Sequence, residues 1–400
     1  MSKWVTVTLD SVTTDGSDGL RRGPFGGAIK KDSFVPDGYK IYEQRHAIYG
    51  DFEAGSYYIG DRRYKELRTF AVMPGDLIVS CSGTLGRVAI VPPSAKPGII
   101  NQALLRIRPK PDVVSSQFFK MLLETPGIQS RLFGSAGGSA IKNVKPLSEI
   151  RRIEFQLPPL PEQQRIAEVL DRAGALRAKR HAALAQLDTL TQSIFLDLFG
   201  HPHHNPKRFS REPLGQVCER VTVGYVGPMA EEYVERGIPL LRSLNVRRGR
   251  IDLHDLKFVS PQFHTKLSKS AIRAGDVVTV RTGQPGTTAV VPKSLGDANC
   301  ADLIVMTCGP RLDPQYLSEA LNIWLGDAES IQGQVGAIQI HFNIGRAKEL
   351  RLPIPPLALQ HEFTRRIEAA RELKTAQKAS LTDLDALFAA LQHQAFRGEL

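Results

Sequence analysis

Two long stretches of the chain carry apolar residues at alternating steps of four and three, which is the heptad pattern of a coiled coil. The first stretch follows the double proline Pro158-Pro159, and its apolar positions are Ile166, Leu170, Ala173, Leu184, Leu187, Ile194 and Leu198. The second follows Pro355-Pro356, and its positions are Phe363, Ile367, Ala370, Leu381, Leu384, Phe388, Leu391 and Ala395. The two stripes superimpose at an offset of 197 residues. Each predicts one helix of roughly 39 residues and roughly 58 Å.

A second repeated pattern consists of short β-branched runs on either side of a glycine-containing turn. Residues 75–92 have this pattern, and residues 275–292 repeat it at an offset of 200. Gly75-Asp76 opens the first copy and Gly275-Asp276 the second. Each copy predicts a β-hairpin.

Polar residues interrupt both helical stripes at the same place. Arg177 and Arg180 occupy seam positions in the first stretch, and Lys374 and Gln377 occupy the equivalent positions in the second. Two interpretations are open. The seam drifts and these side chains extend along its rim, or the basic residues contact a partner subunit or a DNA phosphate.

The chain is therefore built from one module used twice. We predict an α+β fold with two α/β domains in a pseudo-twofold repeat, separated by two long antiparallel coiled-coil helices. An isolated amphipathic helix needs a partner, and the other copy is the obvious one. The predicted boundaries are 1–160 for the first domain, 161–199 for the first helix, 200–210 for a linker, 211–357 for the second domain and 358–400 for the second helix.

Composition narrows the class of partner. The chain has 400 residues, a net charge of +11 and a pI near 9.5. This basic balance favours a polyanionic partner, most often nucleic acid. No apolar run reaches the roughly 20 residues that span a bilayer, and residues 1–9 do not resemble a signal peptide. We expect no membrane association and a cytoplasmic location.

Neither the cysteines nor the histidines predict a metal site. Cys81, Cys218, Cys300 and Cys308 lack the short spacing of a zinc or redox motif. His201, His203 and His204 lie between Pro202 and Pro206 with no acid or cysteine among them. That composition is typical of an extended linker.

The segment 157–167, Leu-Pro-Pro-Leu-Pro-Glu-Gln-Gln-Arg-Ile-Ala, resembles the start of the conserved helix in specificity subunits of type I restriction–modification systems, the HsdS family. The hairpin at 75–86 and the linker at 200–206 also resemble that family, so the resemblance covers the whole chain. The second half departs from it, because Ala358-Leu359-Gln360-His361 keeps only the glutamine Gln360. The departure puts the second helix's contacts in doubt.

The resemblance implies a non-catalytic subunit with two target-recognition domains. Each domain would read one half of a bipartite double-stranded DNA target, and the helices would fix the gap between the half-sites. The helices would also dock two methyltransferase (HsdM-like) subunits, and the assembly would recruit restriction (HsdR-like) subunits. This chain would hold no cofactor, since S-adenosylmethionine, ATP and Mg belong to the partners.

The sequence lacks the catalytic motifs expected of an enzyme of this kind. The sequence has no Gly-x-x-x-x-Gly-Lys-Ser/Thr phosphate loop and no Asn-Pro-Pro-Tyr motif of adenine methyltransferases. This disfavours a single-chain restriction–modification enzyme. Two further alternatives are a tandem-domain DNA-binding regulator without methyltransferase partners and a coiled-coil scaffold with sugar- or protein-binding ends. Only the family resemblance argues against the regulator, and only the basic charge argues, weakly, against the scaffold.

Candidate contact residues lie where the two halves differ and where the helices begin. Polar residues diverge between 20–72 and 219–272, as expected of readers of different base sequences. We predict DNA contacts within 20–50 and 222–250, by Arg21, Arg22, Lys30, Lys31, Arg45, Arg242, Arg247, Arg248 and Arg250. Partner docking is predicted at the first turn of the first helix, by Glu162, Gln163, Gln164 and Arg165. An ordinary first turn explains these four residues equally well.

Overall fold

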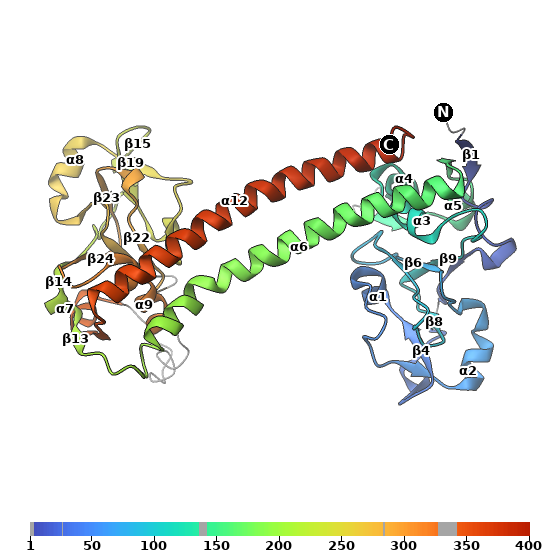
Figure 1. Ribbon diagram of the computed structural model, residues 1–400, viewed down its shortest axis with the longest axis horizontal. Helices are drawn as coiled ribbons and strands as arrows, with labels where there is room; N and C mark the ends of the chain where they lie inside the picture. Colours follow the sequence, from blue (N-terminus) through green and yellow to red (C-terminus); the bar gives the residue numbers. More distant parts are fainter. Residues whose placement is uncertain (1–3, 26, 136–141, 283–284, 327–341) are drawn as a thin grey trace. The chain divides into compact units, whose positions relative to one another are not determined.

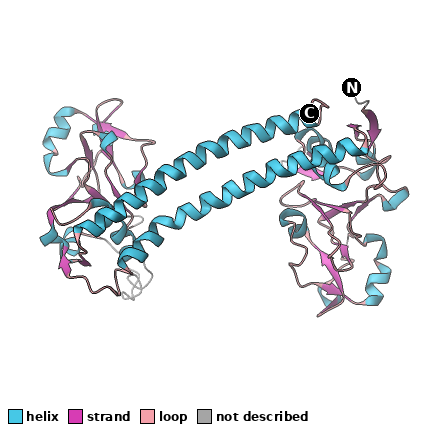
Figure 2. Cartoon of the chain, viewed as in Figure 1, coloured by secondary structure: helices cyan, strands magenta, loops and turns pink. Residues whose placement is uncertain are grey.

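The structure is a computed structural model that describes residues 4–25, 27–135, 142–282, 285–326 and 342–400. The chain forms two compact units. One consists of Met1–Lys179 with Leu381–Leu400, and the other of Arg180–Ser380. Each unit contains sheets, short helices and part of each long helix (Figure 2). The predicted α+β class is confirmed.

The first unit holds two four-stranded sheets. One has the order β2-β9-β6-β7, with strands Leu20–Arg22, Leu104–Ile107, Leu77–Ser80 and Val88–Ile90. The other has the order β3-β5-β4-β8, with strands Phe34–Val35, Tyr58–Ile59, Tyr39–Tyr42 and Gly98–Ile100. Two-stranded pairs join β1 (Val5–Thr8) to β12 (Glu154–Leu157) and β10 (Phe133–Ser135) to β11 (Lys142–Val144). The short helices are α1 (Gln44–Tyr49), α2 (Asp61–Glu66), α3 (Ser116–Leu123), α4 (Pro126–Leu132) and α5 (Leu147–Arg151).

The second unit repeats this plan. A four-stranded sheet has the order β14-β24-β21-β22, with strands Cys218–Val223, Leu303–Cys308, Val277–Val280 and Thr288–Val290. A five-stranded sheet has the order β15-β19-β16-β23-β20, with strands Tyr233–Val234, Lys257–Val259, Ile238–Leu241, Ala298–Cys300 and Ala271–Ile272. Two-stranded pairs join β13 (Arg211–Pro213) to β25 (Arg351–Pro353) and β17 (Val246–Arg247) to β18 (Arg250–Ile251). The short helices are α7 (Leu214–Val217), α8 (Pro261–Lys266), α9 (Pro314–Gly326) and α11 (Ile344–Glu349).

Both predicted hairpins are present. Strand β6 pairs antiparallel with β7, and β21 pairs antiparallel with β22 in the same register, 200 residues later. The Gly-Asp dipeptide before each hairpin has a structural role. Asp76 and Asp276 are each 1% exposed, and each accepts a backbone N–H three residues earlier.

The two aspartates are neutralised by arginines from different strands. Arg108, directly after β9, forms a two-pronged pair with Asp76, at 2.8 and 2.9 Å. Arg220 of β14 reaches Asp276 at 2.9 Å, and Thr307 donates to the same carboxylate at 2.6 Å. A buried carboxylate is costly without such partners. The repeat therefore keeps the buried acid and changes the source of the positive charge.

The two long helices are α6 (Leu160–Phe199) and α12 (Leu357–Ala395) (Figure 1). Within each unit the two helices run antiparallel, since a residue further along α6 contacts a residue earlier in α12. In the first unit Arg177 pairs with Asp385 at 2.6 Å, and in the second Lys374 pairs with Asp188. The predicted heptad helices are confirmed, and their apolar ends join the cores of the two domains at Ile166, Leu170, Phe363 and Ile367.

Polar residues at the middle of the seam pair with the opposite helix. The Arg177 guanidinium also lies 4.5 Å from the ring centre of Phe388. Arg180 donates to the amide oxygen of Gln377. Arg177, Arg180, Lys374 and Gln377 are all half-buried. These contacts support the interpretation that the polar break belongs to the seam, with its charges paired inside the chain.

One glutamine anchors the start of each long helix. The Gln163 side chain accepts from Ser115 N at 2.9 Å and donates to the carbonyls of Val113 and Pro158. The Gln360 side chain makes the same three bonds, to Asp313 N at 2.8 Å and to the carbonyls of Arg311 and Pro355. Both side chains are 0% exposed. The one polar residue that the two helix starts share is therefore a structural clamp.

We predict that Gln360→Leu destabilises the chain by about 3 kcal/mol or more, because it leaves a buried N–H and two buried carbonyls without partners. Gln360→Glu should also destabilise it, since a carboxylate cannot donate to those carbonyls. Urea unfolding of the full chain followed by circular dichroism measures the effect. His361→Ala alters the exposed neighbour and is the control. Equal unfolding midpoints for Gln360→Leu and His361→Ala would contradict the clamp.

Candidate nucleic-acid interface

In the first domain, four loops meet at one end of the sheets. They follow strands β2, β4, β6 and β8, and they meet around residues 101–103. Asn101 N donates to Tyr42 O, Cys81 N donates to Ala103 O, and Gly23 N donates to Leu104 O, all at 2.8–2.9 Å. This end is called the loop end below. Loops on a rigid sheet scaffold are the usual place for contact residues.

The second domain has an equivalent loop end, formed by the loops after β14, β16, β21 and β23. Ala301 N donates to Leu241 O at 2.9 Å, and Gly224 N donates to Leu303 O at 2.7 Å. Gly23 and Gly224 are equivalent because the residues before them pair with equivalent positions, Arg22 with Leu105 and Val223 with Ile304. The scaffold of the two loop ends is thus the same.

Arg21 and Arg22, neighbours on β2, lie on opposite faces of the strand, as strand geometry requires. The Arg22 side chain lies at the loop end, where its Nε is 3.5 Å from Gln102 O and its guanidinium is 5.5 Å from the ring centre of Phe25. Arg21 instead bonds to Ser17 and lies over the Phe70 ring. The loop end therefore includes only Arg22 of this pair.

The other predicted basic residues of the first domain are less constrained. Arg45 is exposed on α1, directly after Gln44, whose amide lies 3.4 Å from Thr84 O of the β6–β7 turn. Lys30 is exposed in the loop that follows Phe25. Lys31 begins a short 3-10 helix, Lys31–Ser33, and its side chain lies outside the described residues. Arg45 and Lys30 remain available for phosphate contacts.

A buried polar residue organises the segment after β4 and after β16. His46 is 0% exposed; its Nδ1 accepts from Glu43 N at 2.8 Å, and its Nε2 lies 2.8 Å from Ala54 O. Asn245 is 2% exposed and makes the corresponding bonds, to Arg242 N at 3.0 Å and to the carbonyls of Asp252 and His254 at 3.2 Å. Different residues thus fix segments of different shape at the same point of the scaffold.

Arg242 lies at the second loop end, but its charge is shared. Its guanidinium donates to the Asp255 carbonyl at 2.7 Å and lies 3.2 Å from the Asp255 carboxylate. The Arg242 hydrogen bond is the first cause that lowers the pKa of Asp255, followed by the charges of Lys257 and Arg242. Arg242 is therefore held in place by a carboxylate that stays ionised.

The cluster 247–250 forms the β17–β18 hairpin, and it is fixed to the helices beside it. Arg248 pairs with Glu319 of α9 at 3.0 Å, and Arg371 of α12 lies 3.3 Å from Gly249 O. Burial raises the pKa of Glu319, and Arg248 partly offsets this. Arg248 is thus partly committed within the fold. Arg250 is exposed, and Arg247 is 3.7 Å from Asp252.

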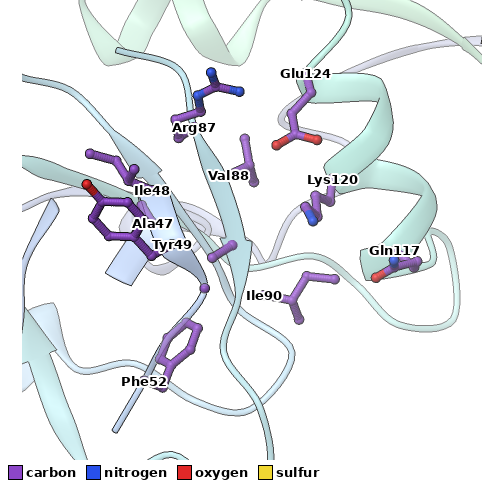
Figure 3. Close-up of a pocket in the computed structure, with 12 residues that line it drawn as sticks. Ala47, Ile48, Tyr49, Phe52, Arg87, Val88, Ile90, Gln117, Lys120 and Glu124 are labelled. Carbon is purple, nitrogen blue, oxygen red and sulfur yellow. The ribbon is translucent and has the colours of Figure 1, made fainter. Parts of the chain in front are cut away.

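In the first domain the surface equivalent to that hairpin site is an open cleft of about 350 Å³ (Figure 3). Figure 3 places Lys120 and Glu124 on the helix side, facing Val88 and Ile90 of β7. In the second domain the β17–β18 hairpin covers the equivalent strand, since Gly249 N donates to Thr288 O. The divergent segments therefore alter the surface around the loop ends as well as their side chains.

Several loop-end residues were not predicted from the sequence. Arg281 follows β21 and lies 3.3 Å from the Asp302 carboxylate, which also accepts from Thr282. Phe25 and Val226 are exposed apolar side chains, 67% and 59% accessible. In the sequence, Arg281 lies directly before Thr282-Gly283, which repeats Ser82-Gly83 at the offset of 200. Its place in the repeated hairpin pattern could therefore have identified it.

Of the residues predicted for partner docking, Gln163 is excluded by its burial. Gln164 and Arg165 are exposed, and Arg165 donates to Leu400 O at 2.8 Å. Glu162 accepts from the Trp4 indole at 3.2 Å. The outer faces of the helices also carry exposed leucines, and Leu176 and Leu373 lie at equivalent positions, 197 residues apart.

Among the residues that the structure describes, no three His, Cys, Asp or Glu side chains are grouped to hold a metal ion. In the 200–210 segment, the His203 ring stacks on Trp324 at 3.8 Å. Burial raises the pKa of the Cys81 thiol to about 11 and that of Cys300 to about 12. These thiols are therefore protonated and poor nucleophiles at neutral pH. Within the described part of the chain, no helix is long and apolar enough to cross a membrane.

Comparison with known proteins gives one consistent result. Residues 25–186 match the family described as type I restriction modification DNA specificity domain. The specificity subunit of the type I restriction enzyme EcoBI from Escherichia coli is 24% identical over 99% of this chain and 86% of its own length.

The chain is similar over nearly its whole length to specificity subunits of type I restriction–modification systems. Its fold is that of the HsdS subunit from Thermoanaerobacter tengcongensis, with a TM-score of 0.52 and 20% identity over 99% of this chain and 97% of the other. A chain from a structure of type I R-M complex assembly matches with a TM-score of 0.65 and 19% identity over 99% and 98%. The resemblance seen in the sequence is thus confirmed. The curated relatives are specificity subunits, and the DNA contacts predicted for this chain remain predictions.

We predict that Arg250→Glu weakens binding of this chain to a random-sequence duplex and makes the dependence of log affinity on log salt shallower by about 1. Arg248→Glu should in addition lower the melting temperature, because it places a second carboxylate beside buried Glu319. Fluorescence anisotropy across a salt series and thermal unfolding measure the two effects. Lys269→Glu, an exposed change in the 3-10 helix Ser268–Ser270, is the control. An unchanged salt slope for Arg250→Glu would remove this residue from the interface.

Proposed function

We propose that this specificity subunit binds an asymmetric bipartite DNA target, with one half-site read at each loop end. The observation that carries the proposal is that the two domains share one backbone scaffold but expose different side chains at their loop ends. Gly23 and Gly224 are equivalent, and so are the four loops that meet at each loop end. In contrast, Arg22, Phe25 and Arg45 of the first domain are replaced by Val223, Val226 and Leu244 in the second. Base identity is read by side chains at groove edges, so different side chains on one scaffold suit different half-sites.

We further propose that α6 and α12 position two methyltransferase subunits, and that restriction subunits join that assembly. Leu176 and Leu373 are 56% and 49% exposed at repeat-equivalent positions. Two copies of one partner would meet the same apolar side chain on each helix. Burial of a leucine on docking contributes about 1.5–3 kcal/mol. The methyl donor, ATP and Mg would bind to those partners.

A methylome comparison tests the DNA target. We predict that N6-methyladenine mapping finds a bipartite motif with two unlike halves, and that the motif disappears when the gene is deleted. Restoring the gene on a plasmid should restore the motif and serves as the control. A methylome that does not change on deletion, with expression confirmed, would contradict the proposed function.

A double substitution tests the docking surface. We predict that Leu176→Glu with Leu373→Glu reduces co-purification of the methyltransferase subunit at least tenfold, because it replaces apolar anchors with charges. The pair Gln186→Glu and Asp383→Asn changes other exposed, repeat-equivalent positions and should leave co-purification intact. Equal yields from both double variants would place the docking surface elsewhere.

A further inference from the structure

The two loop ends each expose an apolar side chain at an equivalent place. Phe25 and Val226 lie two residues after the equivalent glycines Gly23 and Gly224. The glycines are required there. A Cβ on Gly23 would lie 1.8 Å from Asn101 O, and one on Gly224 would lie 2.7 Å from Cys300 O. This close approach sets where the next residues leave the sheet, so the scaffold places residues 25 and 226 equivalently.

Exposure of these side chains has no structural benefit in the folded chain. Phe25 is 67% exposed and Val226 is 59% exposed, and the exposure leaves apolar area in water. Surface apolar residues are ordinary when scattered. Here, however, the property recurs at one position in two domains whose surrounding polar residues differ. A retained apolar character in a divergent surface indicates a common type of contact.

The surroundings of both side chains favour DNA as the occupant. In the first domain the Arg22 guanidinium lies over the Phe25 ring, 5.5 Å from its centre. In the second, Val226 lines a hollow of about 570 Å³ together with Leu244, Arg242, Ser243 and Asp302. An arginine therefore lies beside each apolar side chain, as arginines do where a protein meets base edges beside phosphates. In the second domain this arginine, Arg242, is also paired with Asp255.

The chemistry of base edges then identifies the contact. In the major groove, base pairs present hydrogen-bond donors and acceptors and one apolar group, the 5-methyl group of thymine. We propose that Phe25 and Val226 each contact a thymine methyl group, so that each half-site contains one A·T pair read through apolar contact. This inference rests on the proposed DNA-binding function and adds to it the residues and the base that they select.

Replacing thymine by deoxyuridine removes only the methyl group. The test uses the full chain assembled with its methyltransferase subunits and a duplex carrying the motif found by methylome mapping. Each thymine of the motif is replaced singly by deoxyuridine, and affinity is measured by anisotropy. One replacement in each half-site should weaken binding by about threefold to tenfold.

The variants assign each methyl group to a residue. Phe25→Ala should bind thymine and deoxyuridine duplexes equally at one half-site and keep the difference at the other. Val226→Ala should do the reverse. Met73→Ala is the control: Met73 is an exposed apolar residue that precedes β6, at the end of the strand away from the loop end. This variant should keep the thymine–deoxyuridine difference at both half-sites.

Three outcomes overturn the inference. They are a motif without a sensitive thymine in either half, full thymine discrimination by both alanine variants, and loss of discrimination at both half-sites from one substitution. The second of these would assign the exposed residues to another partner, such as a protein surface. Failure of the proposed function itself is distinguishable, because the wild-type complex would then have no motif from which to build the duplex.

Discussion

Each long helix starts on a buried glutamine whose amide group is bonded to the backbone of the domain that the helix leaves. The Gln163 amide joins Ser115 N, Val113 O and Pro158 O, and the Gln360 amide joins Asp313 N, Arg311 O and Pro355 O. A buried amide that loses these partners costs about 1–3 kcal/mol for each unsatisfied group. The first turn of each helix is therefore fixed to its own domain. Once that turn is fixed, the side of the helix that carries the apolar seam is fixed with it.

The seam has a second constraint, which its polar middle supplies. The ion pairs Arg177–Asp385 and Lys374–Asp188 are counterparts of each other at the repeat offset of 197. Arg180 and Gln377 are also counterparts, so this contact joins one position to its own equivalent. Two copies of the first helix in this register would place Arg180 against Arg180. Polar seam residues cost stability and specify pairing, and here they favour the pairing of unlike halves.

The sequence was informative wherever the structure depends on local pattern. The hairpins, the double prolines, the heptad stripes and the shared polar break all follow from periodicity and turn chemistry, and the structure confirms them. Contacts made through distant residues could not be predicted in this way. In the sequence, Arg21 cannot be told apart from its neighbour Arg22, nor Arg248 from nearby Arg250. In the structure, however, Arg21 packs on Phe70, and Arg248 pairs with Glu319, 71 residues away. The role of Gln163 was missed because its partners come from a loop 48 and 50 residues earlier.

The buried aspartates explain how two copies of one domain can present different surfaces. Asp76 and Asp276 hold the same turn, but Arg108 reaches the first from just beyond the end of β9, and Arg220 reaches the second from β14. The requirement is a positive charge at that point, and either neighbouring strand can provide it. His46 and Asn245 follow the same rule, since an imidazole and an amide make corresponding bonds. The scaffold therefore constrains the position and polarity of a few buried groups, and this leaves the residues at the loop ends free to differ between the halves.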